Sequence, residues 1–333
     1  SGTTGQNIRI TRDYRSILHE EAFINRYLSE FGLSGKNLRI AHFRGEVLPR
    51  ERLKSHQFSV KAPFGNRLIF SSFELGPENF PYYLDQLQSF KPHMLYGYPS
   101  VLLVLAKLLH DHGVSLQLSA VMTSSENLSP ENRLFMESIF QCRVLDWYGQ
   151  AERVAAISLC PRGHYHLVED YSIIELVDSP NGHEIVGTSL FNYAMPLIRY
   201  RTSDYVRIDP EKTQPCTCGS HFRCVDGLFG RKPGYILTPE NQRIPVFLLD
   251  DLFNLNDGIL EYQIAQQHRD ELILNLVTLP SYTGDTEQVI RQRLIERISG
   301  SMSYVFQYCQ RLKRSPGGKI IHFLLEDTAE RRA

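Results

Sequence analysis

The chain has few of the features that mark specialised protein classes. It contains a single tryptophan and five methionines among 333 residues, and its 36 basic side chains nearly balance its 37 acidic ones. A balanced charge gives no bulk electrostatic reason to bind nucleic acid or a membrane surface. The longest apolar run, Val101–Leu109, is interrupted by Lys107 and is about half as long as a bilayer span requires. We therefore expect neither nucleic acid nor membrane as a partner.

Features of secreted proteins are also missing. The chain does not open with a charged segment followed by an apolar one, as a secretory leader would. Six cysteines in a chain of this length do not make a small disulfide framework. The expected compartment is the cytoplasm, and metal binding is the first alternative use of clustered thiols.

What the sequence does contain is typical of a globular protein with two domains. Its residues are 42% hydrophobic and 22% charged, and its length exceeds one ordinary domain. Between residues 38 and 147, strand-like and helix-like segments alternate, which predicts an α/β sheet with helices on its faces. One helix start is explicit, because Ser129 at the N-cap precedes Pro130 in the first turn.

The pattern changes after Glu152. Short β-branched runs separated by turn signals predict a β-rich part over about 153–229. Glycines and Pro233 then interrupt the pattern, and beyond them strands and one helix predict a small α+β domain. We expect a large domain at 1–229 and a small mobile domain at 230–333.

Four short segments carry groups suited to nucleotide chemistry, and each has an ordinary alternative. The first, at residues 1–5, is rich in glycine and hydroxyl groups and suits phosphate, yet it also looks like a cloning remnant. In the second, residues 147–152, an aromatic ring could stack on a base and Glu152 could hold Mg²⁺, or the segment is a simple strand end. In the third, Asp204 could bind ribose hydroxyls or lie in a solvated loop. In the fourth, Lys319 on a Gly-Gly turn could meet a phosphoryl group or face solvent.

The cysteines separate into two groups. Cys142 and Cys309 lie in apolar surroundings and are expected to serve packing. Cys216 and Cys218 form a tight chelating turn, and a tetrahedral Zn²⁺ site could be completed by Cys160 and His166. His164, His221 and Cys224 compete for the same role. We expect a structural site, because four protein ligands leave no position open for water.

The order of these segments is more specific than any one of them. A Ser/Thr-Gly loop, Tyr-Gly-x-Ala-Glu at 148–152, Tyr-Arg-Thr-x-Asp at 200–204, Gly-Arg at 230–231 and Gly-Lys at 318–319 follow one another as in adenylate-forming enzymes. The Pro-Leu-Ile-Arg-Tyr-Arg-Thr block at 196–202 and the Cys-x-Cys-Gly turn resemble the phenylacetate–CoA ligase family, including relatives associated with capsular-polysaccharide biosynthesis. That family carries roughly a hundred residues ahead of the phosphate loop, so the resemblance predicts a chain that lacks its N-terminal segment.

The resemblance implies a role for each matched residue. The catalytic residues would be Lys319, Glu152 and Arg231, with Lys319 bridging the carboxylate and the α-phosphate and Glu152 binding Mg²⁺. Tyr148 would stack on adenine and Asp204 would bind the ribose. The zinc ligands would be Cys160, His166, Cys216 and Cys218. The residues that would contact the nucleotide are Ser1, Thr3, Thr4, Gly5, Ser124, Ser125, Glu126, Tyr148, Gly149, Asp204 and Arg231.

The implied activity is ATP-dependent activation of a carboxylic acid, aromatic or otherwise compact, to an acyl-adenylate, followed by transfer to coenzyme A. The acceptor could instead be an amine or a sugar-linked group. A further alternative is that the protein is a catalytically inactive homologue that binds the nucleotide. A zinc-stabilised α/β domain of unrelated function is the remaining alternative, and a homodimer is compatible with the family. Three departures from the family pattern bear on these alternatives: Gly234 at the hinge, no glycine-centred pattern at 238–247, and Gln6-Asn7 after the phosphate loop.

Overall fold

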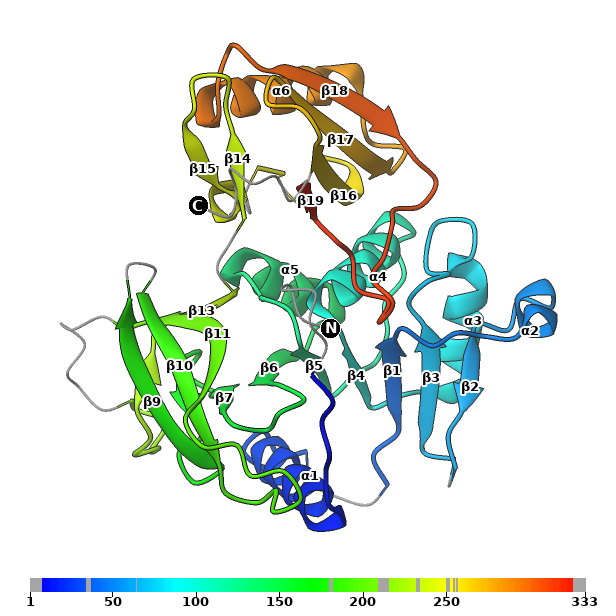
Figure 1. The fold of residues 1–333 in the computed structure, drawn as a ribbon. Coiled ribbons are helices and arrows are strands. Elements are labelled where there is room, and N and C mark those ends of the chain that lie inside the picture. Colours follow the sequence, from blue (N-terminus) through cyan, green and yellow to red (C-terminus); the bar gives the residue numbers. More distant parts are fainter. Residues whose placement is uncertain are drawn as a thin grey trace. The chain divides into compact units, whose positions relative to one another are not determined.

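A computed structural model describes residues 8–33, 37–63, 65–179, 182–208, 216–231, 234–249, 252, 253, 255 and 257–325. Figure 1 labels the helices and strands along the chain. The chain divides into two compact units, each built from several segments. The first unit comprises residues 1–38, 119–128 and 143–232, and the second comprises 39–118, 129–142 and 233–333. The residues of the expected phosphate loop, Ser1, Thr3, Thr4 and Gly5, lie outside the described part.

The first unit is built on five consecutive strands of a mixed sheet. The strand order is β12-β8-β7-β6-β5, where β5 and β6 are parallel and the others pair antiparallel. The strands are β5 (Ala120–Ser124), β6 (Arg143–Gly149), β7 (Ala156–Leu159), β8 (Tyr165–Leu167) and β12 (Cys224–Val225). Because the side chains of neighbouring residues in a strand point to opposite faces, Trp147 and Tyr148 lie on opposite sides of this sheet.

Helix α1 (Tyr14–Ser29) packs on the Trp147 side. Its N-cap is Asp13, whose carboxylate accepts a 2.7 Å hydrogen bond from the Ser16 amide. The buried hydroxyl of Tyr27 donates to the carbonyls of Asp146 and Leu159, at 3.1 and 2.7 Å, so it ties the helix to both β6 and β7.

A second, antiparallel sheet completes the first unit. Its order is β13-β11-β10-β9, and its strands are β9 (Ser172–Ser179), β10 (Gly182–Ser189), β11 (Tyr200–Arg207) and β13 (Gly227–Arg231). Its core contains Ile174, Ile185 and Val206, which pack with Ile157 and Leu167 of the first sheet. The two sheets therefore share one hydrophobic core, as expected for sheets packed face to face.

The second unit begins with the strand order β4-β1-β3-β2. Strands β3 and β4 both run parallel to β1, and β2 is antiparallel to β3. The elements of this segment are β1 (Ile40–Arg44), α2 (Arg50–Lys54), β2 (Ser59–Lys61), β3 (Arg67–Ser71), α3 (Phe80–Phe90), β4 (Met94–Gly97), α4 (Pro99–Asp111) and α5 (Pro130–Phe140). The longest apolar run of the sequence lies in helix α4, in which Val101, Leu102 and Leu105 are fully buried.

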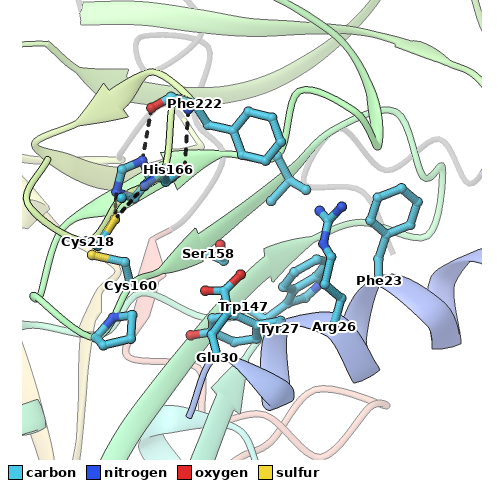
Figure 2. A pocket seen from close by; sticks show the side chains of 14 residues that line it. Phe23, Arg26, Tyr27, Glu30, Trp147, Ser158, Cys160, His166, Cys218 and Phe222 are labelled. Atoms are coloured by element: carbon cyan, nitrogen blue, oxygen red, sulfur yellow. Dashed lines mark hydrogen bonds between the residues drawn. The ribbon is translucent and has the colours of Figure 1, made fainter. Parts of the chain in front are cut away.

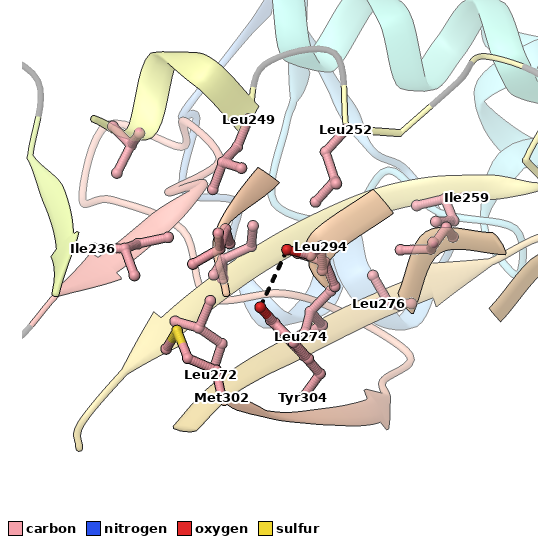
Figure 3. Close-up of a cluster of buried hydrophobic side chains, with 14 residues drawn as sticks. Ile236, Leu249, Leu252, Ile259, Leu272, Leu274, Leu276, Leu294, Met302 and Tyr304 are labelled. Carbon is pink, nitrogen blue, oxygen red and sulfur yellow. Dashed lines mark hydrogen bonds between the residues drawn. The ribbon is translucent and has the colours of Figure 1, made fainter. Parts of the chain in front are cut away.

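The C-terminal part of the second unit is the expected α+β structure. A four-stranded sheet of order β18-β17-β16-β19 is accompanied by the hairpin β14-β15. The elements are β14 (Tyr235–Leu237), β15 (Arg243–Pro245), η1 (Val246–Leu249), β16 (Ile259–Gln266), β17 (Glu271–Thr278), α6 (Gly284–Arg297), β18 (Ser303–Tyr308) and β19 (Phe323–Leu325). Leucines of β17 and α6 and the ring of Tyr304 form its core, where the Tyr304 hydroxyl donates to the Leu294 carbonyl at 3.2 Å (Figure 3).

None of the helices in the described ranges is both long enough and apolar enough to cross a membrane.

We expect stability to fall as the pH drops from about 6.5 towards 4, partly because of His322. Burial lowers the pKa of this imidazole to about 4, although its ring nitrogen meets the Tyr262 carbonyl at 3.2 Å. In this interval the unfolded chain binds a proton that the folded chain does not. Each pH unit of decrease therefore lowers the free energy of unfolding by up to about 1.4 kcal/mol per histidine of this kind. The variant His322→Gln should show a shallower decline in the free energy of unfolding, measured by urea titration at several pH values. Equal slopes for the two proteins would contradict the assignment.

Candidate functional site

The residues expected to hold the nucleoside are brought together in the first unit from three strands. The Tyr148 hydroxyl, at the end of β6, donates a 2.7 Å hydrogen bond to Oδ2 of Asp204 in β11. Asp204 in turn pairs with Arg231 in the backbone register of β11 and β13. An aromatic ring and a carboxylate held together in this way match what a nucleoside needs, a stacking surface and an acceptor for hydroxyl groups.

The segment Ser124-Ser125-Glu126 follows the end of β5. Ser125 has a left-handed backbone with φ of 73°, and its hydroxyl lies 3.3 Å from that of Ser124. Because β5 and β6 are parallel neighbours, their carboxyl ends lie at the same sheet edge, so this loop and Gly149 stand at one edge. In open α/β sheets this edge is where ligands bind.

Glu152, the expected Mg²⁺ ligand, lies in the turn after β6. One of its carboxylate oxygens accepts a 3.2 Å hydrogen bond from the Tyr200 hydroxyl of β11. The second sheet thus contacts the Tyr148–Glu152 segment at two points, through Asp204 and through Tyr200. A carboxylate at this position can offer the oxygen ligand that Mg²⁺ prefers.

Asp146 is a buried acid that the sequence analysis did not single out. It lies on β6 and accepts hydrogen bonds from the Thr123 and Tyr165 hydroxyls, at 2.6 and 2.8 Å. Burial raises its pKa to about 6, against the lowering effect of these hydrogen bonds. Only the structure identifies it, because a lone Asp inside a strand is no motif.

We expect the Tyr148–Asp204 hydrogen bond to matter for nucleotide affinity. Replacing Tyr148 with phenylalanine should weaken ATP binding by about tenfold, because a hydrogen bond to a charged group is lost from a positioned carboxylate. Isothermal titration with ATP would measure the change. The matched control is Tyr165→Phe, which removes a comparable hydrogen bond from Asp146 on the same sheet and should leave ATP affinity unchanged. Equal losses in both variants would show a general effect on the sheet.

The lysine expected to meet the reacting groups lies in the second unit, on a tightly closed loop. Arg314 and Ile320 form an isolated antiparallel bridge. Between them the Ser315 amide donates to the Lys319 carbonyl at 2.9 Å, and the Lys319 amide donates to the Ser315 hydroxyl at 3.1 Å. Gly318 has φ of 82°, a backbone conformation that glycine adopts without strain. The loop therefore has one defined shape and presents Lys319 at its end.

This loop is docked against the ends of β1, β3 and β4 in the same unit. The Tyr98 hydroxyl donates to the Gly317 carbonyl and the Ser72 hydroxyl donates to the Gly318 carbonyl, each at 3.0 Å. The ammonium group of Lys319 lies 5.2 Å from the centre of the Tyr98 ring. A Cβ atom on Gly45 would lie 2.1 Å from the Gly317 oxygen, so only glycine fits there.

The expected zinc ligands converge in the first unit. Cys160, His166, Cys216 and Cys218 offer ligand atoms that all lie within 4.8 Å of one another. The Cys160 and Cys216 sulfurs are 3.8 Å apart, and the Cys218 sulfur lies 3.4 Å from Nε2 of His166. Nδ1 of His166 lies 3.0 Å from the Phe222 carbonyl, which favours a proton on Nδ1 and leaves Nε2 to face the sulfurs.

The residue chemistry of this cluster fits a tetrahedral Zn²⁺ site. Burial opposes ionisation of Cys160, yet its hydrogen bond with His166 and those from backbone amides lower its pKa to about 6, which favours the thiolate that binds metal. Two of the alternative ligands border the cluster. Nδ1 of His164 lies 3.2 Å from the Cys216 sulfur, and the Cys224 sulfur lies 3.6 Å from Nδ1 of His166.

A cavity of about 420 Å³ opens beside the cluster on the Trp147 side of the sheet (Figure 2). Strands β6, β7 and β8 place Trp147, Ser158 and His166 in one cross-strand row, because these residues pair directly in the sheet register. The cavity is lined by this row, by the cluster residues Cys160 and Cys218, and by α1 residues that include Arg26 and Glu30.

A solved structure shows the class of fold to which the chain belongs. The structure of 2-hydroxyisobutyryl-CoA ligase in the postadenylation state, in complex with R3-HIB-AMP, matches with a TM-score of 0.68 at 18% identity, over 96% of this chain and 71% of that one. The chain therefore has the α/β fold of adenylate-forming CoA ligases, which confirms the predicted fold class.

The sequence matches are more particular. Residues 236–324 match the family described as the CapK C-terminal domain. The chain is 22% identical to Protein CapK of Staphylococcus aureus, over 96% of this chain and 71% of that protein. It is 25% identical to phenylacetate-coenzyme A ligase of Pseudomonas putida, over 69% of this chain and 57% of that protein. The chain is thus CapK-like, with phenylacetate–CoA ligases among its homologues, and it spans little more than half the length of that ligase.

Proposed function

We propose that the protein activates a carboxylic acid with MgATP to an acyl-adenylate and transfers the acyl group to an acceptor, for which the thiol of coenzyme A is the first candidate. The observation that carries this proposal is the convergence of Tyr148, Asp204 and Arg231 from three strands beside the Ser124–Glu126 loop. The fold shared with adenylate-forming CoA ligases supports the same reaction class.

In the proposed reaction, a substrate carboxylate oxygen forms a bond to the α-phosphorus of ATP, and the bond from that phosphorus to the bridging oxygen of pyrophosphate breaks. Such a step depends mainly on positioning and on stabilising negative charge. Lys319 would neutralise charge on the carboxylate and the α-phosphate. Glu152 would hold Mg²⁺, which supplies further charge stabilisation. In the second step the acceptor thiolate would attack the acyl carbon and release AMP.

We propose further features of the substrate, the compartment and the metal. The acid is aromatic or otherwise compact, and the reaction takes place in the cytoplasm, where ATP and coenzyme A are available. The cluster at Cys160, His166, Cys216 and Cys218 binds Zn²⁺ in a structural role. The matches to Protein CapK and to the CapK C-terminal domain favour testing a second class of acceptor as well, an amine or a sugar-linked group.

The deciding experiment is carboxylate-dependent exchange of pyrophosphate into ATP, measured with the complete natural protein over a panel of aromatic and short branched acids. Exchange that requires one acid class would support adenylation and identify that class. Product analysis with coenzyme A, amines and sugar-linked acceptors would then distinguish the acceptors. ATP binding without exchange for any acid would overturn the proposal in favour of a nucleotide-binding protein without ligase activity.

A further inference from the structure

Two buried polar side chains of β16 hold the stems of the loop that carries Lys319. Glu261 and Gln263 are two residues apart and therefore point to the same face of the strand, and they are 5% and 3% exposed. Buried polar groups are rare in a core unless they bind a specific partner. Both partners here belong to the segment around the loop.

Gln263 contacts the backbone on both sides of the loop. Its amide nitrogen donates to the Lys313 carbonyl at 3.2 Å and to the Ile321 carbonyl at 2.7 Å. These two carbonyls lie just outside the Arg314–Ile320 bridge that closes the loop. One side chain thus uses both of its donors to hold the two stems together.

Glu261 acts on the same stem through a buried ion pair. Its carboxylate pairs with the Arg314 guanidinium at 2.5 Å, and both side chains are buried. Another nitrogen of the same guanidinium lies 3.5 Å from the carbonyl of Gly318, the residue before Lys319. Burial raises the pKa of the Glu261 carboxyl, and the positive charges of Arg314, Lys107 and Arg311 oppose this shift. A buried pair of this kind gives little net stability but fixes geometry, since the guanidinium fork has a set direction.

We propose that Glu261 and Gln263 are positioning residues for Lys319, because they fix both stems of its loop relative to β16. This inference rests on the proposed function, in which Lys319 meets the reacting groups. The contacts of the two side chains are with the loop stems and with Arg314. They act by keeping the lysine in the one loop shape that the Ser315 hydrogen bonds and the Gly317 and Gly318 carbonyl contacts define.

The test compares two glutamines of the same strand. Gln263→Met removes the stem contacts with nearly the same side-chain volume. Gln266→Met is the matched control, because Gln266 is 1% exposed and its amide holds the backbone of Leu237 in β14 at 3.0 and 2.7 Å. Both variants lose buried hydrogen bonds, but only the first loosens the loop.

We expect Gln263→Met to lower the turnover number of ATP–pyrophosphate exchange by about tenfold or more, with KM for ATP and acid changed less than threefold, because misplacing a catalytic group affects the chemical step. Transfer from preformed acyl-adenylate should proceed at the normal rate. Gln266→Met should keep the normal turnover number. Amides of residues 315–320 should exchange with deuterium faster in Gln263→Met only.

Equal turnover numbers for the two variants, or unchanged deuterium exchange in the loop, would overturn this inference. If Gln263→Met does not fold, Arg314→Lys serves as the second variant. It keeps the positive charge opposite Glu261 but loses the two-pronged guanidinium group, so we expect the same turnover and deuterium results. If the unaltered protein shows no exchange with any acid, the proposed function fails. The deuterium measurement still tests whether Glu261 and Gln263 hold the loop.

Discussion

Replacing Lys319 with alanine should lower the rate of carboxylate-dependent ATP–pyrophosphate exchange by about two to three orders of magnitude. A fixed positive charge that acts on the developing charge of the transition state contributes a factor of this size. Binding of ATP should change little, because the residues proposed to bind the nucleoside lie on β6, β11 and β13 and not on this loop. Exchange kinetics and isothermal titration would separate the two effects.

The control for this variant is Lys313→Ala, which removes an exposed ammonium group only six residues away while leaving the Lys313 carbonyl for Gln263. Its exchange rate should match that of the unaltered protein. If Lys319→Ala exchanges pyrophosphate nearly as fast as Lys313→Ala, the proposed role of Lys319 in the reaction is wrong.

The second large effect concerns the cysteine–histidine cluster. The variant Cys218→Ser should lose one equivalent of bound zinc and at least about 3 kcal/mol of unfolding free energy, because metal binding and folding are coupled in such sites. Elemental analysis and urea titration would measure the two quantities. We expect a strong chelator to reproduce the loss of stability in the unaltered protein.

A matched control is available in Cys142→Ser. Cys142 is partly buried and is not one of the four clustered residues, and burial raises the pKa of its thiol to about 12, so it has the character of a packing residue. This variant should keep its zinc. If the natural protein contains no zinc, or if both serine variants unfold at the same urea concentration, the cluster is not a metal site. Variants of Cys224 and His164 would show whether either residue replaces a proposed ligand.

The order of elements was predictable from the sequence where local signals are strong. The predicted strand–helix alternation agrees with the structure at β1 and from α3 to β6, whereas α2, β2 and β3 were not predicted. Helix α5 begins at Pro130 behind the Ser129 cap, as the sequence predicts. Strong apolar periodicity and cap residues act locally, so they can be read without a fold. Helix α1 and strand β18 were not predicted, because α1 contains many polar residues and β18 is half exposed.

The candidate site was predictable only as a set of short motifs. Their sequence positions did not show that Tyr148 contacts Asp204 or that Tyr200 contacts Glu152, since these contacts join two different sheets. The residues that hold the lysine loop carry no motif at all. Gly45, Ser72 and Tyr98 lie more than two hundred positions before Lys319, and Glu261 and Gln263 look like ordinary polar residues of a strand. Only tertiary structure brings them to the loop.

Trp147, the single tryptophan of the chain, gives this protein a natural optical reporter. Its indole is 4% exposed, lies against the Tyr27 ring and lines the cavity beside the cysteine–histidine cluster, while its neighbour Tyr148 holds Asp204 from the other side of the sheet. Ultraviolet emission excited at the red edge of the absorption band comes from this one residue, so it needs no label and no spectral deconvolution. Stopped-flow traces of that emission would follow release of the proposed zinc and binding of the proposed nucleotide from the same strand, in real time and in unmodified protein.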